Sequence, residues 1–238
     1  MPGGQVIPDG CATHGGPAWL WSDRTHASWH DWGQYLAANG YAVLLPNPRG
    51  SIGRGPSFTT AGFDDVGGGE WTDILAGVDH VVELGVADPD LLGIGGWSWG
   101  GYLTAWGITQ TTRFKAAVVG AGVTNLFSDQ GNSNLTHFYD YLFSTNAYTD
   151  PDAYVRRSPI CCVSNVVTPT LVLHGAEDAV VNRAQGQELY NALRYLGQEV
   201  EMAIYPREGH GFKERRHQLD LIRRVLEWFD RHLKRESE

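Results

Sequence analysis

Short apolar segments alternate along the chain with longer segments whose apolar residues recur every three or four positions. The short segments are typical of buried strands and comprise residues 41–45, 91–94, 116–119, 170–173 and 200–205. The longer segments are typical of amphipathic helices and comprise residues 71–82, 189–196 and 219–233. This alternation predicts an α/β fold with a mostly parallel central sheet and helices on both of its faces.

Residues 122–160 interrupt this alternation. The segment places aromatic side chains among Asn, Ser, Thr and Asp residues. A loop of this length in a compact domain usually forms a lid or a pocket wall. Because the chain has 238 residues and no internal repeat, we expect residues 1–238 to form a single domain that carries this lid-like insertion.

Composition and charge exclude several classes of protein. Hydrophobic residues make up 42% of the chain and charged residues 19%, which excludes a disordered chain and a coiled coil. The formal net charge of -9 repels phosphate backbones and anionic lipids, so no nucleic-acid or membrane partner is expected. No apolar run approaches the roughly 20 residues of a membrane span, and residues 1–4 lack the basic and apolar parts of a signal peptide, so neither feature is expected. Three cysteines without metal-type spacing favour a cytoplasmic location.

The strongest chemical signal is the sequence GWSWG at residues 96–100. It follows a predicted strand and precedes a stretch compatible with a helix, which is the context of a nucleophile elbow centred on Ser98. Two other interpretations are a Gly-rich structural turn and a dinucleotide fingerprint that starts at Gly93. The fingerprint is weak because Ser98 replaces its third glycine and the acidic residue expected about 20 positions later is missing.

A nucleophilic serine needs a base and an acid that orients the base. Asp178 and His210 follow two of the predicted strands in the order Ser, Asp, His that α/β-hydrolases use. We therefore predict His210 as the base and Asp178 as the orienting acid. Glu177 competes with Asp178 for that role, and a solvated loop histidine is the alternative for His210. His174, at the end of a strand, is expected to be a buried, hydrogen-bonded histidine.

A Gly-rich loop near the N-terminus supplies a third element. Residues 13–17, THGGP, are similar to an oxyanion loop of the HGGG type, in which adjacent glycines leave their N–H groups accessible. The N–H of Trp99, directly after the predicted nucleophile, would be the second donor. A plain Gly-Gly-Pro turn is the alternative.

The remaining candidates carry less chemistry. His26 and His30 have the spacing of two metal ligands on a helix, but no carboxylate or third histidine is placed to complete a site, so neither a metal nor a cofactor is expected. Cys161 and Cys162 are predicted to be small core residues before a strand. Arg49 is expected to form a structural salt bridge rather than to meet a substrate oxygen.

Several segments together resemble the catalytic domain of the prolyl oligopeptidase family of serine peptidases, in its acylaminoacyl-peptidase and dipeptidyl-peptidase-like branch. Their sequences are HGGP (residues 14–17), NPRGS (47–51), GWSWGGY (96–102), HGAEDAVV (174–181) and YPREGHGF (205–212). The resemblance covers about residues 13–233 and implies an α/β-hydrolase fold. It further implies a catalytic triad of Ser98, Asp178 and His210.

The same resemblance assigns the oxyanion donors to the N–H groups of Gly16 and Trp99. It also implies that the aromatic-rich insertion lines a pocket for an apolar side chain or an acyl group, with Phe127, Phe138 and Tyr139 as its candidate residues.

The chain departs from the family at its beginning. Family members usually carry a β-propeller before the catalytic domain, and we expect none here. Residues 8–10, Pro-Asp-Gly, are expected to break any strand before the HGGP loop, so that the leading edge of the sheet is absent or rebuilt in an N-terminally shortened chain.

The expected activity is that of a serine hydrolase that forms an acyl-enzyme. The resemblance favours a peptidase that cleaves short or acylated peptides. Because the same groups cleave esters with a better leaving group, a carboxylesterase acting on small acyl esters is the alternative. A binding module with a hydrolase fold is the non-enzyme alternative. An exposed edge of the sheet would also allow a homo-oligomer.

Overall fold

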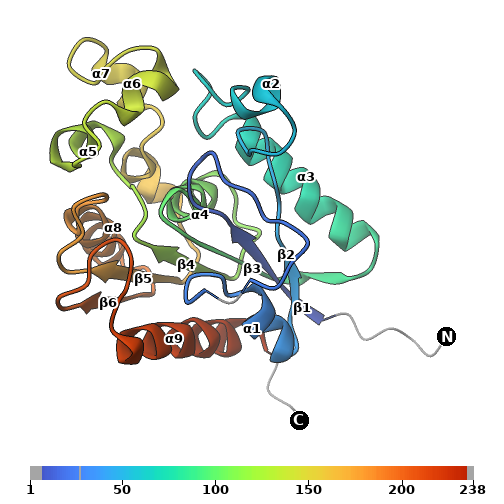
Figure 1. The fold of residues 1–238 in the computed structure, drawn as a ribbon. Helices are drawn as coiled ribbons and strands as arrows, with labels where there is room; N and C mark the ends of the chain where they lie inside the picture. Colours follow the sequence, from blue (N-terminus) through green and yellow to red (C-terminus); the bar gives the residue numbers. More distant parts are fainter. Residues whose placement is uncertain (1–6, 27, 235–238) are drawn as a thin grey trace.

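The computed structural model describes residues 7–26 and 28–234, in which a parallel sheet lies between two layers of helices (Figure 1). The sheet has the strand order β2-β1-β3-β4-β5-β6, and each neighbouring pair is parallel. The strands are β1 (Ile7–Thr13), β2 (Ala42–Leu44), β3 (Ala87–Trp97), β4 (Ala116–Gly120), β5 (Thr170–Gly175) and β6 (Val200–Tyr205). The predicted α/β fold with a parallel sheet is confirmed.

Helices cover both faces of the sheet, and several short helices lie above it in the view of Figure 1. They are α1 (Gly33–Ala38), α2 (Pro56–Thr59), α3 (Gly69–Glu83), α4 (Trp99–Gln110), α5 (Leu126–Asn132), α6 (Phe138–Phe143), α7 (Pro151–Val155), the 3-10 helix η1 (Pro159–Asn165), α8 (Ala184–Tyr195) and α9 (Arg215–Leu233). The three helices expected from apolar periodicity correspond to α3, α8 and α9.

Two buried clusters hold the helices to the sheet. One cluster joins α3, α4 and α8 to one face through residues such as Ile74, Leu103 and Leu189. The other joins α1 and α9 to the opposite face through residues such as Leu36 and Trp228. The burial of apolar side chains on both faces explains why the central strands are continuous apolar runs rather than alternating ones.

Strand β1 contradicts the expectation that Pro-Asp-Gly breaks the chain before the HGGP loop. The strand lies between β2 and β3 and pairs with both. Pro8 is tolerated because the β1–β3 register shifts between Ile7 and Asp9, so the residue without an N–H sits at an irregularity of the ladder. From Asp9 onward the pairing is regular, and it brings the HGGP loop to the carboxyl end of β3.

The segment after β4 consists largely of short helices. Helices α5, α6 and α7 lie at the top of Figure 1, on the far side of the sheet from α9. The expectation that the two adjacent cysteines are core residues is wrong, because Cys161 is exposed and Cys162 is only half-buried on η1. The residues around the two cysteines show no regular spacing of apolar positions, so the sequence does not predict which face of the 3-10 helix the cysteines occupy.

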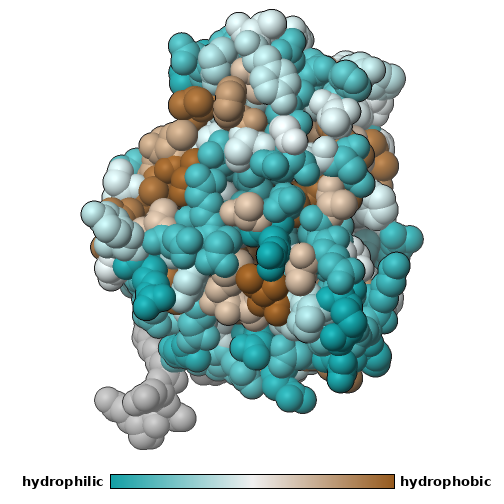
Figure 2. Space-filling model, turned by 90° about the vertical axis from the view of Figure 1, so that its left-hand side faces the viewer, coloured by the Kyte–Doolittle hydropathy of each residue, from teal (hydrophilic) through white to brown (hydrophobic). Residues whose placement is uncertain are grey.

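The face that includes α8 and β6 is shown in Figure 2, where hydrophilic residues predominate and hydrophobic ones lie in small groups between them. Strand β6 forms one edge of the sheet within the described residues. None of the helices in this described part of the chain has both the length and the apolar character that a membrane span needs.

Candidate active site

Ser98 occupies the turn between β3 and α4, at the carboxyl end of the central strand. Its φ of 61° and ψ of -119° lie outside the regions that L residues favour, and its N–H donates to the Gly120 carbonyl at 2.9 Å. The turn is therefore held by the neighbouring strand in a strained conformation, which is the form that a nucleophile elbow requires.

The glycine after the elbow is required by close backbone packing. A Cβ added to Gly101 would lie 2.5 Å from the Gly120 carbonyl oxygen and 2.7 Å from the Gly122 Cα. These neighbours are backbone atoms that cannot turn aside, so only glycine lets α4 begin this close to β4. This close approach positions the start of α4 directly behind Ser98.

The structure brings the three predicted residues Ser98, Asp178 and His210 together. His210 Nε2 lies 2.8 Å from Ser98 Oγ, and His210 Nδ1 lies 2.8 Å from Asp178 Oδ2. An ionised carboxylate accepts but cannot donate, so the proton of a neutral His210 sits on Nδ1 and leaves Nε2 free to accept the Ser98 hydroxyl proton. Glu177, the other candidate for the acid, has its side chain exposed to solvent.

Asp178 is held rigidly in its loop after β5. Its Oδ1 accepts from the N–H groups of Val180 at 2.9 Å and Val181 at 3.0 Å. Burial alone would raise the pKa of this carboxyl, but hydrogen bonding to the imidazoles of His174 and His210 outweighs burial and places the pKa of Asp178 well below its usual range. As expected, His174 is buried, and its Nε2 lies 2.8 Å from the Val181 carbonyl oxygen.

A buried carboxylate that the sequence reasoning missed braces the loop of His210. Glu208 is fully buried and accepts from the N–H groups of Lys213 at 2.7 Å and Glu214 at 2.8 Å, and its Oε1 lies 2.9 Å from His217 Nδ1. Burial alone would raise the pKa of Glu208, but these hydrogen bonds lower it. Ligand atoms of Glu208, Glu214 and His217 lie within 4.8 Å of one another, but these contacts already explain the cluster as a structural brace.

The HGGP loop lies against the nucleophile. A Cβ added to Gly15 would be 3.4 Å from Ser98 Cβ, and Gly16 has a φ of 131° that only glycine adopts readily. Trp99 is the first residue of α4, so its N–H is one of the helix donors that have no partner within the helix. The two predicted donor residues, Gly16 and Trp99, line the same small cavity as Ser98.

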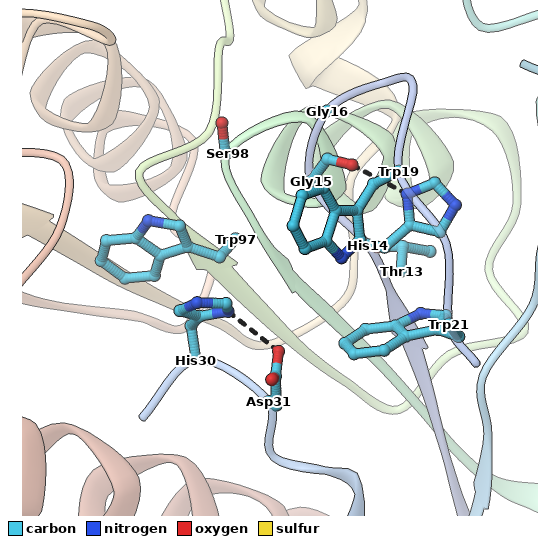
Figure 3. A pocket seen from close by; sticks show the side chains of 10 residues that line it. All are labelled: Thr13, His14, Gly15, Gly16, Trp19, Trp21, His30, Asp31, Trp97 and Ser98. Carbon is cyan, nitrogen blue, oxygen red and sulfur yellow. Dashed lines mark hydrogen bonds and ion pairs between the residues drawn. The ribbon is translucent and has the colours of Figure 1, made fainter. Parts of the chain in front are cut away.

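Two cavities meet at Ser98 and Gly16. The larger, of about 220 Å³, is lined by residues from the HGGP loop, from the chain that follows it and from the end of β3 (Figure 3). The smaller, of about 50 Å³, is lined in part by Val123, Phe138 and Tyr139 from the segment after β4. Of the three aromatic residues expected at the pocket, Phe127 is instead 39% exposed on α5 and lines neither cavity.

A second buried carboxylate lies behind Trp99 and was also missed. Glu70 accepts from the N–H of Gly67 at 2.7 Å and from Trp99 Nε1 at 3.1 Å. Burial raises the pKa of Glu70 to about 7, although both hydrogen bonds act in the opposite direction. The sequence contained no signal for this contact, since Glu70 and Trp99 lie on different helices.

The structure also shows the contacts of Arg49, His26 and His30, the weaker candidates from the sequence. Arg49 forms a two-pronged ion pair with Asp73, with nitrogen–oxygen distances of 2.9 Å and 2.7 Å, which confirms the structural salt bridge. A carboxylate does lie beside His26 and His30, but these three residues do not form a group that could hold a metal ion. Asp31 lies between them, with an oxygen 2.9 Å from His30 Nδ1 and another 3.9 Å from His26 Nδ1.

The parallel sheet, with a serine at the turn between its central strand and a buried helix, defines an α/β-hydrolase fold. The sequence profile of the prolyl oligopeptidase family matches residues 28–236, and the chain belongs to this family. It is 36% identical to the uncharacterized peptidase YuxL of Bacillus subtilis (98% of this chain, 36% of the relative) and 31% identical to the acylamino-acid-releasing enzyme of Arabidopsis thaliana (97% and 31%).

A solved structure gives the same assignment. The Pyrococcus horikoshii acylaminoacyl peptidase superimposes with a TM-score of 0.91 at 30% identity, over 100% of this chain and 39% of that protein. The chain therefore spans about a third of the length of the proteins it matches. The shared part corresponds to the catalytic domain of the family.

Proposed function

We propose that this chain is a serine hydrolase that cleaves acyl bonds through a covalent acyl-enzyme, with short or acylated peptides as its substrates. The observation that carries the proposal is the continuous hydrogen-bonded line from Ser98 through His210 to Asp178, at 2.8 Å in both steps. The strained turn that presents Ser98 supports the same role.

In the first half of the reaction, Ser98 Oγ attacks the substrate carbonyl carbon while His210 Nε2 takes the hydroxyl proton. The carbonyl oxygen becomes an oxyanion that the N–H groups of Gly16 and Trp99 stabilise, and each such donor contributes on the order of 3 kcal/mol. When the tetrahedral intermediate collapses, His210 gives its proton to the departing amine. The acyl group remains bonded to Ser98.

In the second half, water attacks the acyl carbon and His210 takes its proton. Collapse of the second tetrahedral intermediate breaks the bond to Ser98, whose oxygen regains the proton from His210. Asp178 keeps its charge throughout and stabilises the imidazolium that forms twice in each cycle. The small cavity beside Phe138 and Tyr139 is the proposed site for an apolar side chain or acyl group.

Replacement of the nucleophile tests the proposal. The Ser98→Ala variant should lose both hydrolysis and covalent labelling by a fluorophosphonate, and its circular dichroism spectrum should match that of the wild type. Persistent labelling of the variant, or an unlabelled wild-type protein, would refute the assignment. Turnover of p-nitrophenyl acyl esters without turnover of acyl-aminoacyl p-nitroanilides would identify the chain as an esterase, the alternative expected from the sequence.

A further inference from the structure

Aromatic side chains and one carboxylate line the larger cavity beside Ser98. Trp19, Trp21 and Trp97 line it together with Asp31 and His30. Figure 3 shows Asp31 below Trp97 and Trp21, with one carboxylate oxygen in contact with the ring of His30. Its volume of about 220 Å³ is below the roughly 300–1,000 Å³ of pockets for drug-sized ligands and suits one amino-acid side chain.

One carboxylate oxygen of Asp31 is available to a ligand. The other oxygen, Oδ1, lies 2.9 Å from His30 Nδ1. His26 Nδ1 lies 3.9 Å from Oδ2, beyond hydrogen-bond distance, while its Nε2 lies 2.8 Å from the Ser22 carbonyl oxygen. No hydrogen bond to Oδ2 is formed among the described residues, although the Asp31 side chain is only 12% exposed.

The charge around the cavity favours a cation. Its ten described lining residues include no Lys or Arg. Among these residues, burial lowers the pKa of His14, despite a backbone contact at Gly15 that raises it, so this ring stays neutral at neutral pH. Indole faces attract cations. The net charge of -9 adds long-range attraction for a cationic substrate.

The position of the cavity assigns it to one side of the scissile bond. Trp97 Nε1 donates to the His210 carbonyl at 3.0 Å, so one wall is joined to the loop that carries the proposed base. The departing amine must lie on the side of His210, because it takes its proton from that imidazole. Gly16 lines both cavities, whereas Trp99 and the segment after β4 line only the smaller one.

We propose that Trp21, Trp97 and Asp31 form a subsite for a cationic side chain, Lys or Arg, on the leaving-group side of the cleaved bond. This inference rests on the proposed hydrolase function. It names the class of substrate that the chain selects, namely peptides whose residue directly after the scissile bond carries an ammonium or guanidinium group.

The first test compares leaving groups that differ only in charge. We expect N-acetyl-phenylalanyl-lysine amide to be cleaved with a kcat/KM at least about tenfold above that of the norleucine analogue, which lacks the ammonium group. Asp31→Asn should reduce this ratio to about one or two. Asp23→Asn, at an exposed position in the same loop, should keep the ratio of the wild type. A wild-type ratio near one would overturn the subsite.

A second measurement separates the subsite from the catalytic proposal. Lysine amide should quench the tryptophan fluorescence of the Ser98→Ala protein in a saturable manner, whereas norleucine amide should bind about tenfold more weakly. Adding Asp31→Asn to this protein should remove the difference. Equal binding of both amides overturns the subsite even if the wild type is an active hydrolase. If fluorophosphonate fails to label the wild type, the hydrolase function is overturned. The binding measurement still decides whether the subsite exists, because it does not depend on hydrolysis.

Discussion

The hydrogen bonds of Asp178 predict a specific defect when this carboxylate becomes an amide. In Asp178→Asn, the amide oxygen is needed by the N–H groups of Val180 and Val181, which Oδ1 accepts at 2.9 Å and 3.0 Å. The amide nitrogen would then replace Oδ2 and donate to His210 Nδ1. This contact places the imidazole proton on Nε2, where it blocks transfer from Ser98.

The size of the defect follows from the cost of the opposite amide orientation. Turning the amide would restore the active tautomer but leave two backbone N–H groups facing an NH2 group. Each unsatisfied donor costs about 1–3 kcal/mol, so the active arrangement lies roughly 2–6 kcal/mol higher. At about 1.4 kcal/mol for each factor of ten, kcat should fall by between about 30-fold and about 10⁴-fold. KM should change little, since Asp178 lines neither cavity.

The assay is steady-state hydrolysis of an activated acyl ester, with thermal unfolding as a check of the fold. Glu177→Gln is the matched control, because the Glu177 side chain is exposed next to Asp178 and competed with it for the same role. This control should retain at least half of the wild-type kcat. A folded Asp178→Asn protein with kcat within tenfold of the wild type would refute the tautomer argument. A large loss of kcat in Glu177→Gln would show that Glu177, rather than Asp178, orients the base.

Two further predictions concern stability. Because burial raises the pKa of Glu70 from 4.5 to about 7, Glu70 should lower the free energy of unfolding by about 3 kcal/mol as pH rises from about 4.5 through 7. Asp9 and Asp129, whose pKa values burial raises to about 6, add to the decline of the wild type, so Glu70→Gln should reduce the decline between pH 5 and pH 8 in urea titrations without abolishing it. An equal decline in the variant and the wild type contradicts this prediction. The free energy of unfolding of Ser98→Gly should be about 1 kcal/mol higher than that of Ser98→Ala, because only glycine relieves the strain at a φ of 61°. Equal midpoints of the two variants in urea unfolding would exclude that strain.

The parts of the structure that local patterns determine were predictable. The elbow at Ser98 could be recognised because the glycine spacing, the preceding strand and the following helix are all local. Asp178 and His210 could be placed because the carboxyl ends of parallel strands meet at one edge of the sheet. Their distances of 2.8 Å required the structure, since the sequence does not specify how the loops after β5 and β6 turn.

The missed features depend on contacts between distant segments. Strand β1 was missed because Pro8 is a strand breaker in isolation, and only the irregular pairing with β3 shows how it is accommodated. Glu70 and Glu208 are charged residues that sequence patterns place at the surface, but helix packing and loop closure bury them. The spacing of His26 and His30 suggests one face of a helix, but both residues lie in the irregular chain before α1, where Asp31 contacts His30.

The two tryptophans that flank Ser98 divide the site into its two sides. Trp97 belongs to the buried cluster on the α1 and α9 face and lines the larger cavity, whereas Trp99 belongs to the cluster on the α3 and α4 face and lines the smaller one. Because these two clusters lie on opposite faces of the sheet, the turn that exposes Ser98 also separates the cavities. Selectivity for the leaving group and for the acyl group should therefore be separable, with changes at Trp97 acting on the first and changes at Trp99 on the second.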